Sequence, residues 1–371
     1  MTHEIDETFM SRAIELARRG AGRTAPNPPV GCVLVRDQQI IGEGWHKKAG
    51  EAHAEADALA QCPVSTLGAT AYVTLEPCNH TGRTPPCAAA LVQAGIERIV
   101  IGSIDPNPNV TGGGVERLRA AGLDVRTGVL QEQSDSLIAP FSHWLLHKRP
   151  LVTLKVATSL DGRIATMTGH SQWVTGEEAR LDVHQRRNET DAILVGSGTV
   201  RADDPRLTTR LPNGEGRDPI RVVVSNDPKK LPANARILNE ACGAATILVT
   251  HQPITQSSTL TNAAVEVWTV NRDEDGVSLR ETLNQLGERN IQSLLVEGGQ
   301  QIATSFLKQG LVDRIVCYIA PKIIGGDGRE WAGALGFRTM NAAIRLENVR
   351  IQPMGSDVCI EGDCVYGDSR R

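Results

Sequence analysis

Aromatic side chains are scarce in this sequence of 371 residues, where Phe, Trp and Tyr together make up 3%. Alanine, glycine and aliphatic side chains must therefore form the core, which suits layered α/β structure. The sequence also lacks any run of the ~18 to 20 apolar residues that a membrane-spanning helix needs. Its first segment, MTHEIDETFMSRAIELARRG, has the periodicity of an amphipathic helix and not the pattern of a signal peptide. We therefore expect a cytoplasmic protein without a membrane partner.

Excess charge of either sign is missing as well. The net charge is −4 and the pI is about 6.2, whereas a duplex-binding protein normally has a basic face. Nucleic acid is therefore not the expected partner. Eight cysteines in 371 residues do not make a disulfide framework, and thiols stay reduced in the cytoplasm. The cysteines are therefore expected to be core side chains or metal ligands, and not disulfides.

The length of the chain and its hydrophobic pattern predict two domains. Up to about residue 145, strands alternate with helices: strands at Gly31–Val35, Gln39–Glu43, Ala71–Leu75 and Arg98–Ser103, and helices beginning near His53, Pro86 and Gly114. A second series follows the dipeptide Arg149-Pro150 and comprises LVTLKVAT, DAILVG, IRVVVS, ATILVT, LLVEGG and DRIVCYIAP. Short apolar runs of this kind are typical of buried parallel strands. We place the two domains at residues 1–147 and 148–371.

The stretch LEPCNHTGRTPPC places Cys78 and Cys87 on either side of a loop rich in proline and polar residues. With His53 upstream they offer the nitrogen and thiolate ligands that zinc prefers, and catalytic zinc sites use three protein ligands plus a water. Glu55, two positions beyond His53, is suited to carry protons. Histidine-x-glutamate followed by Pro-Cys is a zinc deaminase signature, except that eight residues, not two, separate these cysteines. A closed structural zinc site with His80 as fourth ligand is the alternative.

The eight residues between the cysteines, Asn79–Pro86, bear on the substrate. Arg83 is suited to bind a phosphate, although a solvated arginine on a loop is the alternative. Upstream, Asn27 begins the stiff turn NPPVG and has an amide that can read a ring amide. His46 is a further candidate, as is Asp105–Pro108, which follows a strand at the sheet edge where ligands collect.

The C-terminal half lacks the G-x-G-x-x-G fingerprint, because Gly196–Arg201 begins like one and has no third glycine. An ordinary Rossmann site is therefore not expected. In LLVEGGQQ, a strand ends at Glu297 and two glycines precede a helix, whose first amides suit an anion; a simple strand–helix turn is the alternative. The charged segment Val200–Arg210 contains arginines that either bind a phosphate or lie on a solvated loop.

The motifs NPPVGCV, HAEADAL, LEPCNHTGRTPPC and IGSIDPNP resemble the bifunctional deaminase–reductases of riboflavin biosynthesis, and the similarity runs the length of the chain. The resemblance implies an α/β protein with an N-terminal cytidine-deaminase-like αβα domain and a C-terminal dihydrofolate-reductase-like α/β domain. The first domain would use zinc to deaminate diaminohydroxyphosphoribosylaminopyrimidine. The second would use NADPH to reduce the ribosyl group of 5-amino-6-(5-phosphoribosylamino)uracil to a ribityl chain. The family also implies a homo-oligomer formed through the reductase domain.

The same resemblance implies roles for individual residues. Zinc would be held by His53, Cys78 and Cys87, with Glu55 transferring protons. The substrate contacts of the deaminase would be Asn27, His46, His80, Arg83 and Asn107. Those of the reductase would be Lys155, Ser171, Arg187, Leu207, Arg210 and Glu297. The NADPH contacts would be Ala157, Trp173, Thr199, Asp203, Ser225, Gly299, Gln300, Gln301, Ile302, Ala303, Thr304 and Ser305. Asp203 or Lys155 is the candidate for assisting proton movement, since hydride transfer is the chemistry of the cofactor.

Two other functions stay open from the residues themselves. One is a deaminase of nucleosides or of tRNA adenosine with an unrelated second domain, against which the cysteine spacing and the lack of basic charge count. The other is a zinc-binding scaffold without catalysis that is joined to a nucleotide-sensing domain. In such a scaffold Glu55 would have no role.

Overall fold

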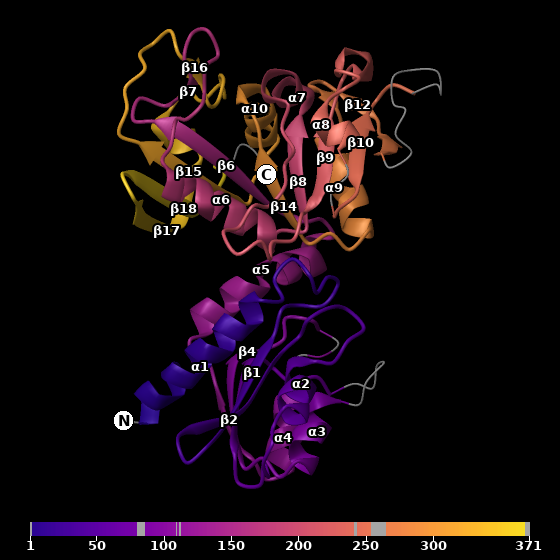
Figure 1. Ribbon diagram of the computed structural model, residues 1–371, viewed down its shortest axis with the longest axis vertical. Coiled ribbons are helices and arrows are strands. Elements are labelled where there is room, and N and C mark those ends of the chain that lie inside the picture. The colour runs from indigo at the N-terminus through magenta and orange to yellow at the C-terminus, as the bar shows by residue number, and fades with distance from the viewer. Residues whose placement is uncertain are drawn as a thin grey trace. The chain divides into compact units, whose positions relative to one another are not determined.

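The computed structural model describes residues 2–79, 86–108, 110, 113–240, 243–253 and 265–367. The chain divides into two compact units, Met1–Lys148 and Arg149–Arg371, each of which is built around its own sheet (Figure 1). His80 and Arg83, two of the predicted substrate contacts, lie outside the described residues. In the part of the chain that is described, no helix has the length and apolar character to cross a membrane.

The first unit is an αβα layer structure around a five-stranded sheet of order β2-β1-β3-β4-β5. Strand β1 is antiparallel to both neighbours, and β3, β4 and β5 are parallel. The strands are β1 (Gly31–Arg36), β2 (Gln39–Trp45), β3 (Thr70–Leu75), β4 (Arg98–Ser103) and β5 (Asp124–Thr127), and the helices are α1 (Thr2–Arg18), α2 (Ala54–Ala60), α3 (Cys87–Gln93), α4 (Gly113–Ala120) and α5 (Gln131–His147). The predicted hairpin and the predicted strands and helices of this half are confirmed.

Both faces of this sheet are covered, because successive residues of β1 point to opposite sides. Cys32 and Leu34 belong to a cluster with buried side chains of α2, α3 and α4. Val33 and Val35 belong to a second cluster with buried side chains of α1. Small residues permit close approach: a Cβ on Gly44 of β2 would lie 2.3 Å from a backbone nitrogen of α2. The alanine-rich, aromatic-poor composition thus gives thin and tightly packed layers.

Helix α1 is tied to the sheet by a fully buried carboxylate, Asp6. Arg98 donates two hydrogen bonds of 2.8 Å to it, Arg126 donates one of 2.7 Å, and the Tyr72 hydroxyl donates one of 3.0 Å. Burial raises the pKa of Asp6, but the hydrogen bonds from Arg98 and Tyr72 outweigh it and hold the pKa below its usual range. The charge of Asp6 is therefore part of what fixes α1 on the sheet.

Replacing Asp6 with alanine should destabilise the first unit by about 3 kcal/mol, because it removes the buried anion that Arg98 and Arg126 share and leaves Arg98 only its exposed partner Asp124. Since the pKa of Asp6 is lower in the folded than in the unfolded chain, its contribution is present above the unfolded pKa of about 4 and is lost as pH falls through the folded value. Urea unfolding of wild type and variant at neutral and acidic pH measures both effects.

The matched control is Glu15→Ala on the same helix, whose carboxylate is exposed and pairs with Arg12. An exposed pair of this kind contributes less than about 1 kcal/mol. If Asp6→Ala costs no more than Glu15→Ala, or if its cost does not shrink toward acidic pH, the buried ion cluster does not anchor α1.

The second unit is built on a nine-stranded sheet of order β11-β10-β9-β8-β14-β6-β15-β18-β17. Its strands are β6 (Leu151–Ser159), β8 (Ala192–Gly196), β9 (Ile220–Val224), β10 (Thr246–Thr250), β11 (Val265–Thr269), β14 (Ser293–Glu297), β15 (Arg314–Ala320), β17 (Arg345–Met354) and β18 (Asp357–Val365), with the short pairs β7 (Arg163–Ala165) and β16 (Arg329–Glu330), and β12 (Arg272–Asp273) and β13 (Gly276–Val277). The helices are α6 (Glu177–Glu189), α7 (Ser197–Asp203), α8 (Arg236–Asn239), α9 (Leu279–Glu288) and α10 (Gln300–Lys308), with 3-10 turns η1 (Pro228–Lys230) and η2 (Met340–Ala342).

The order of the parallel strands places the polar ends of several of them together. Strand β14 is inserted between β6 and β8, and in this register Glu297 is the partner of Lys155. The apolar runs predicted as buried parallel strands correspond to β6, β8, β9, β10, β14 and β15. Ligands in open α/β sheets bind outside the carboxyl ends of such strands, where the strand order reverses. A ligand site is therefore expected at the sheet edge formed by the carboxyl ends of β8, β9 and β14.

Candidate functional site

Three ligand groups converge in the first unit. His53 precedes α2 as its N-cap residue, Cys87 is the first residue of α3, and Cys78 lies three residues beyond the end of β3. Their ligand atoms all lie within 4.8 Å of one another. Because two helix starts and one strand end meet here, the backbone fixes the three side chains before any metal binds.

The spacing of these atoms fits zinc. Tetrahedral zinc, at about 2.1 Å from nitrogen and about 2.3 Å from sulfur, separates two such ligand atoms by roughly 3.6 Å. The Nδ1 atom of His53 lies 3.6 Å from Sγ of Cys78 and 3.2 Å from Sγ of Cys87. Two thiolates and one imidazole leave a fourth tetrahedral position that a water can take, as in catalytic zinc sites.

The two thiols lie close enough to change each other's pKa. The hydrogen bond from Cys87 lowers the pKa of Cys78 to about 4, and the same contact together with burial raises the pKa of Cys87 far above its usual range. Two adjacent thiolates need a cation between them, since like charges at this distance disfavour each other. The pair is therefore chemically prepared for a divalent metal.

Glu55 lies beside this cluster in the first turn of α2 and is almost fully buried. Burial is the main cause that raises the pKa of its carboxyl group. A carboxylate whose pKa is moved toward neutrality can take up and release protons at physiological pH. The burial and raised pKa of Glu55 are properties that a proton carrier needs.

Asn27 and His46, two predicted substrate contacts, lie together next to the metal ligands. The rings of His46 and His53 are 5.4 Å apart in an edge-on arrangement. Nδ1 of His46 lies 2.9 Å from the carbonyl oxygen of Ala52, and Nε2 lies 3.0 Å from the amide nitrogen of Asn27. Because a carbonyl only accepts, the proton is on Nδ1 and Nε2 accepts from Asn27. This orientation leaves the amide oxygen of Asn27 as an acceptor for a ligand.

The sequence analysis missed one carboxylate at this site, Glu76. It is buried, and it accepts hydrogen bonds from the backbone nitrogens of Gly114 and Val115 at 3.0 Å and of Asp105 at 3.3 Å. Asp105 in turn accepts from the backbone nitrogen of Asn107 at 2.8 Å, which fixes a third predicted substrate contact. Glu76 thus joins the cysteine loop, the start of α4 and the end of β4. Its signal in the sequence was its place in the motif LEPC.

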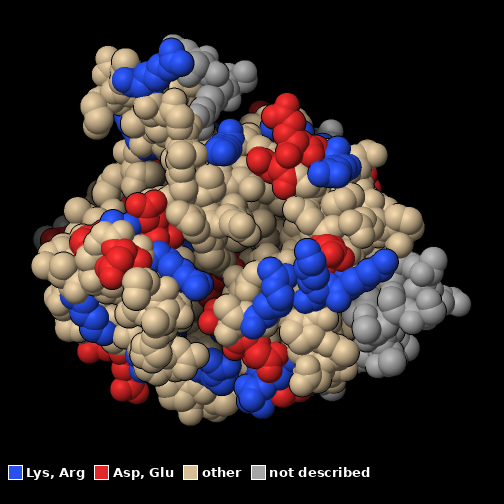
Figure 2. Space-filling model, turned by 90° about the horizontal axis from the view of Figure 1, so that it is seen from above, with Lys and Arg blue, Asp and Glu red and all other residues tan. Residues whose placement is uncertain are grey.

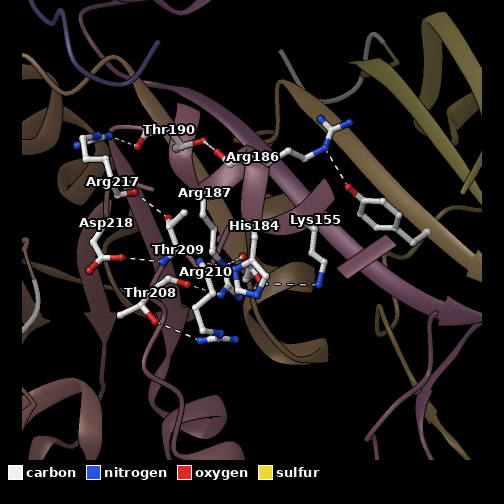
Figure 3. Close-up of polar contacts among 12 residues, drawn as sticks. Lys155, His184, Arg186, Arg187, Thr190, Thr208, Thr209, Arg210, Arg217 and Asp218 are labelled. Carbon is white, nitrogen blue, oxygen red and sulfur yellow. Dashed lines mark hydrogen bonds and ion pairs between the residues drawn. The ribbon is translucent and has the colours of Figure 1, made fainter. Parts of the chain in front are cut away.

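A second cluster gathers around Glu297 at the end of β14, and its members Lys155 and Arg187 are labelled in Figure 3. Arg187 of α6 binds it with two hydrogen bonds of 2.7 and 2.9 Å, and Nζ of Lys155 lies 3.6 Å away. Burial raises the pKa of Glu297, but Arg187 and Lys155 outweigh it and lower the pKa to about 2. Three of the predicted reductase residues are thus brought together as an ionised group.

Leu207 and Arg210 lie on the segment next to this cluster. Arg187 donates a hydrogen bond of 3.1 Å to the carbonyl of Thr208, between them. The guanidinium of Arg210 donates to Oγ1 of Thr208 and has no carboxylate partner within the described ranges, whereas Arg206 is paired with Glu240 at 2.6 Å. Of Arg206 and Arg210, the arginine left available for an anion is therefore Arg210.

His184 of α6 is a further residue that the sequence analysis missed. Its Nδ1 atom accepts a hydrogen bond of 3.2 Å from the backbone nitrogen of Arg210. Burial, followed by the charges of Arg187 and Arg210, lowers the pKa of His184 to about 4. The only sequence signal was its position three residues before Arg187, which places both side chains on one face of a helix.

A cleft of about 570 Å³ lies at the carboxyl edge of the parallel strands. It is bounded by the starts of α7 and α10 and by residues that follow β9, and its basic side chains are Arg201, Lys230 and Lys308. On the face drawn in Figure 2 the surface is hollowed, and lysine and arginine side chains lie beside the hollow. An elongated cleft with basic groups and a helix start suits a phosphorylated nucleotide cofactor.

Five of the predicted cofactor residues line this cleft, namely Gln300, Gln301, Ile302, Thr304 and Ser305. Others lie beside it or elsewhere: Gly299 is the N-cap of α10, Thr199 lies in α7, Asp203 ends α7, and Ala157 lies in β6. Ala303 points into the hydrophobic core and Trp173 is mostly exposed under the guanidinium of Arg180. Ser171 is followed by a turn in which Val174 donates to its carbonyl.

One predicted cofactor contact, Ser225, does not itself line the cleft, although its neighbours Val224 and Asn226 do. Successive residues of an extended segment point to opposite sides, so the side chain of Ser225 is directed away from the cleft. Its hydroxyl is buried and has no hydrogen-bond partner among the described residues.

Comparison with known families agrees with both sites. Residues 3–103 match the cytidine and deoxycytidylate deaminase zinc-binding region, and residues 150–360 match the RibD C-terminal domain. The cluster of His53, Cys78 and Cys87 falls within the first match. Fold and site together define an enzyme in which a zinc-binding deaminase domain is joined to a reductase domain.

Relatives that are similar along nearly the whole chain identify the family more specifically. The riboflavin biosynthesis protein RibD of Aquifex aeolicus is 43% identical over 97% of this chain and 99% of its own, and that of Escherichia coli is 40% identical over 96% and 98%. A solved structure from Thermotoga maritima, described as a diaminohydroxyphosphoribosylaminopyrimidine deaminase/5-amino-6-(5-phosphoribosylamino)uracil reductase, is 39% identical, covers 98% of this chain with 100% of its own, and superposes with a TM-score of 0.85. The chain belongs to the RibD family of bifunctional riboflavin biosynthesis deaminase–reductases.

Proposed function

We propose that the chain catalyses two successive steps on one phosphoribosyl pyrimidine: hydrolytic deamination of diaminohydroxyphosphoribosylaminopyrimidine, then reduction of the resulting 5-amino-6-(5-phosphoribosylamino)uracil by NADPH. The observation that carries the proposal is the pair of sites in one chain, a zinc ligand set with a buried glutamate and a basic nucleotide cleft beside an ionised cluster. We assign the deaminase to residues 1–147 and the reductase to residues 148–371.

In the deaminase step, His53, Cys78 and Cys87 hold zinc, which when bound lowers the pKa of a coordinated water to near neutrality. Glu55 takes the proton of the attacking water. It then returns protons to the ring nitrogen and to the departing ammonia, so that the amine-bearing carbon becomes a carbonyl. Asn27 presents its amide oxygen to the pyrimidine, because His46 holds its amide nitrogen.

The remaining deaminase contacts are proposed from the family alone. His80 and Arg83 belong to the loop between the cysteines, and Asn107 is held by Asp105 at the end of β4. A phosphate needs a planar, permanently charged partner, which Arg83 supplies. Thiolate ligands also need a reducing compartment, so we propose a cytoplasmic location.

In the reductase step, NADPH supplies the hydride that reduces the opened ribosyl group. The cofactor would lie along α10, with Gly299–Ser305 at its phosphates and the segment around Ser225, whose neighbours line the cleft, on its other side. Of the two candidates for assisting proton movement we favour Lys155 over Asp203. Nζ of Lys155 lies in the cluster with Glu297 and Arg187, whereas Asp203 is exposed at the end of α7.

The substrate side of the reductase would comprise Ser171, Leu207 and the Glu297 cluster, with Arg210 at the phosphate. The lack of a carboxylate partner for Arg210 in the described structure supports this. Both reactions act on the same ribose phosphate, so each site needs its own phosphate contact. Arg83 and Arg210 would meet that demand separately.

We also propose that the chain forms a homo-oligomer through the reductase unit. Strand β17 is the last strand of the nine-stranded sheet, and Val349 and Ile351 on it are exposed. Exposed sheet edges with apolar side chains are sites of pairing with another chain.

The reductase proposal is tested with residues 149–371 expressed alone. Because this half forms a compact unit with its own core, the fragment should fold and oxidise NADPH with the deaminated ribosylaminouracil phosphate at a rate close to that of the full chain. It should not act on the diaminopyrimidine. A fragment that is folded by circular dichroism and binds NADPH, yet does not oxidise it with this substrate, would contradict a self-contained reductase.

A further inference from the structure

The segment Leu207–Arg210 is held in place by side chains instead of by a helix or strand. Leu207 is buried and has a φ of 55°, a left-handed conformation that costs a non-glycine residue free energy. The next residues are each tied down: Arg187 donates to the carbonyl of Thr208 at 3.1 Å, and Asp218 accepts from the backbone nitrogen of Thr209 at 2.7 Å. The last tie is the bond between the backbone nitrogen of Arg210 and His184.

The chemistry of that last bond fixes the protonation state of the His184 ring. A backbone N–H can only donate, so Nδ1 must be unprotonated and the neutral ring has its proton on Nε2. The charged groups that face the ring are Arg187 on the same helix, Arg210 on the held segment and Glu297 at the end of β14. Burial and the two arginines outweigh the glutamate, so the ring stays neutral at pH 7 and the bond persists (Figure 3).

We propose that His184 is a positioning residue of the reductase: its Nδ1 atom fixes the backbone of Arg210 and so directs the Arg210 guanidinium at the phosphate of the substrate. This inference rests on the proposed function of the reductase site. His184 itself does not touch the reacting atoms. It acts through Arg210, whose guanidinium bonds only to Thr208 among the described residues and therefore depends on the backbone of Arg210 for its direction.

Helix α6 supplies two side chains to this one segment. His184 and Arg187 lie three residues apart and bind the backbone at Arg210 and at Thr208 respectively. Arg187 is in turn locked to Glu297 by two hydrogen bonds. Leu207–Arg210 and Lys155 are therefore held by the same cluster around Glu297. This arrangement fixes the distance between the group that would bind the phosphate, Arg210, and the group that would face the ribosyl carbon, Lys155.

The test compares three variants of the full chain. His184→Asn keeps an acceptor in the same place, because the amide oxygen of asparagine and Nδ1 of histidine are equally far along the side chain. His184→Leu removes the acceptor, and His184→Gln keeps the polarity but moves its amide one bond further. The matched control is Gln185→Leu, an exposed position on the same helix whose side chain contacts only Glu189. The reductase reaction is followed through NADPH oxidation with the deaminated ribosylaminouracil phosphate.

Leucine and glutamine at position 184 should raise the KM for this substrate at least about ten-fold, the effect of one lost hydrogen bond to a positioned group. Asparagine should stay within about three-fold of wild type. The KM for NADPH and the deaminase rate should not change in any variant. In calorimetry with ribose 5-phosphate, the leucine variant should bind more weakly at one of the two phosphate sites proposed above, and the asparagine variant should bind as wild type does at both.

An unchanged substrate KM in the leucine and glutamine variants overturns the proposal. Equal losses in the asparagine and leucine variants also overturn it, because the ring would then act through its packing and not through its acceptor. If wild-type protein binds ribose 5-phosphate but does not oxidise NADPH with this substrate, the proposed reductase function fails. The calorimetric comparison still decides the role of His184 in that case.

Discussion

Replacing Glu55 with glutamine should abolish deamination and leave zinc in place. Glutamine has nearly the same shape but cannot accept and return a proton, and every proton transfer of this step is assigned to Glu55. General acid–base groups contribute about 10² to 10⁴-fold, so a residue that serves at several points should cost at least about 10³-fold in rate. The zinc ligands themselves are untouched by the change. The measurement is ammonia release from the diaminopyrimidine, together with metal analysis of the same sample.

The control for Glu55→Gln is Glu97→Gln, which makes the same chemical change at an exposed position of the same unit. It should deaminate as wild type does. The reductase rate of Glu55→Gln with the deaminated substrate should also equal that of wild type, which shows that only one site was altered. Deamination by Glu55→Gln at a rate near wild type would refute the proton-carrier assignment.

Removing a zinc ligand should have the second large effect. Cys87→Ala takes away one of the two thiolates, and since even residues that only orient a ligand cost about 10 to 100-fold in metal affinity, a lost ligand should cost more. The variant should purify without zinc and without deaminase activity. Because a ligand that binds the folded state stabilises it, its first unit should also melt at a lower temperature than wild type.

Cys62→Ala is the matched control, since Cys62 lies in the same unit and its thiol donates its hydrogen bond to the carbonyl of Val64, away from the zinc ligands. It should keep zinc and full activity. If Cys87→Ala binds zinc as wild type does and still deaminates, the ligand set is wrong. Full zinc without deamination would instead point to the closed site with His80 as an additional ligand.

The zinc site could be predicted from the sequence because its information is local. His53, Cys78 and Cys87 each follow or begin an element that the pattern predicts, and these elements bring the three ligand atoms within 4.8 Å of one another. The αβα order of the first unit was accessible for the same reason, since strands and helices alternate along the chain. The structure and the family match confirm the predicted fold and the predicted class of enzyme. The roles of the individual site residues stay predictions.

What the sequence could not show are bonds between distant residues. Glu76 binds backbone groups of Gly114 and Val115 almost forty positions away, and its place in the motif LEPC does not reveal those partners. His184 is in the same position, because its role depends on where the segment at Arg210 lies. The position of β14 between β6 and β8 likewise depends on the packing of the whole sheet. The pairing of Lys155 with Glu297 cannot be predicted unless this strand order is known.

The central claim is that one chain performs deamination and then reduction at two separate sites. The most direct test is to give purified, zinc-loaded protein the diaminopyrimidine and to identify the products by mass spectrometry, with and without NADPH. Without NADPH we expect the deaminated ribosylaminouracil phosphate and one ammonia for each molecule converted. With NADPH we expect the ribityl product and one NADPH oxidised for each ammonia released. A ribityl product that still contains the original amine, or the same product with and without NADPH, would contradict the account.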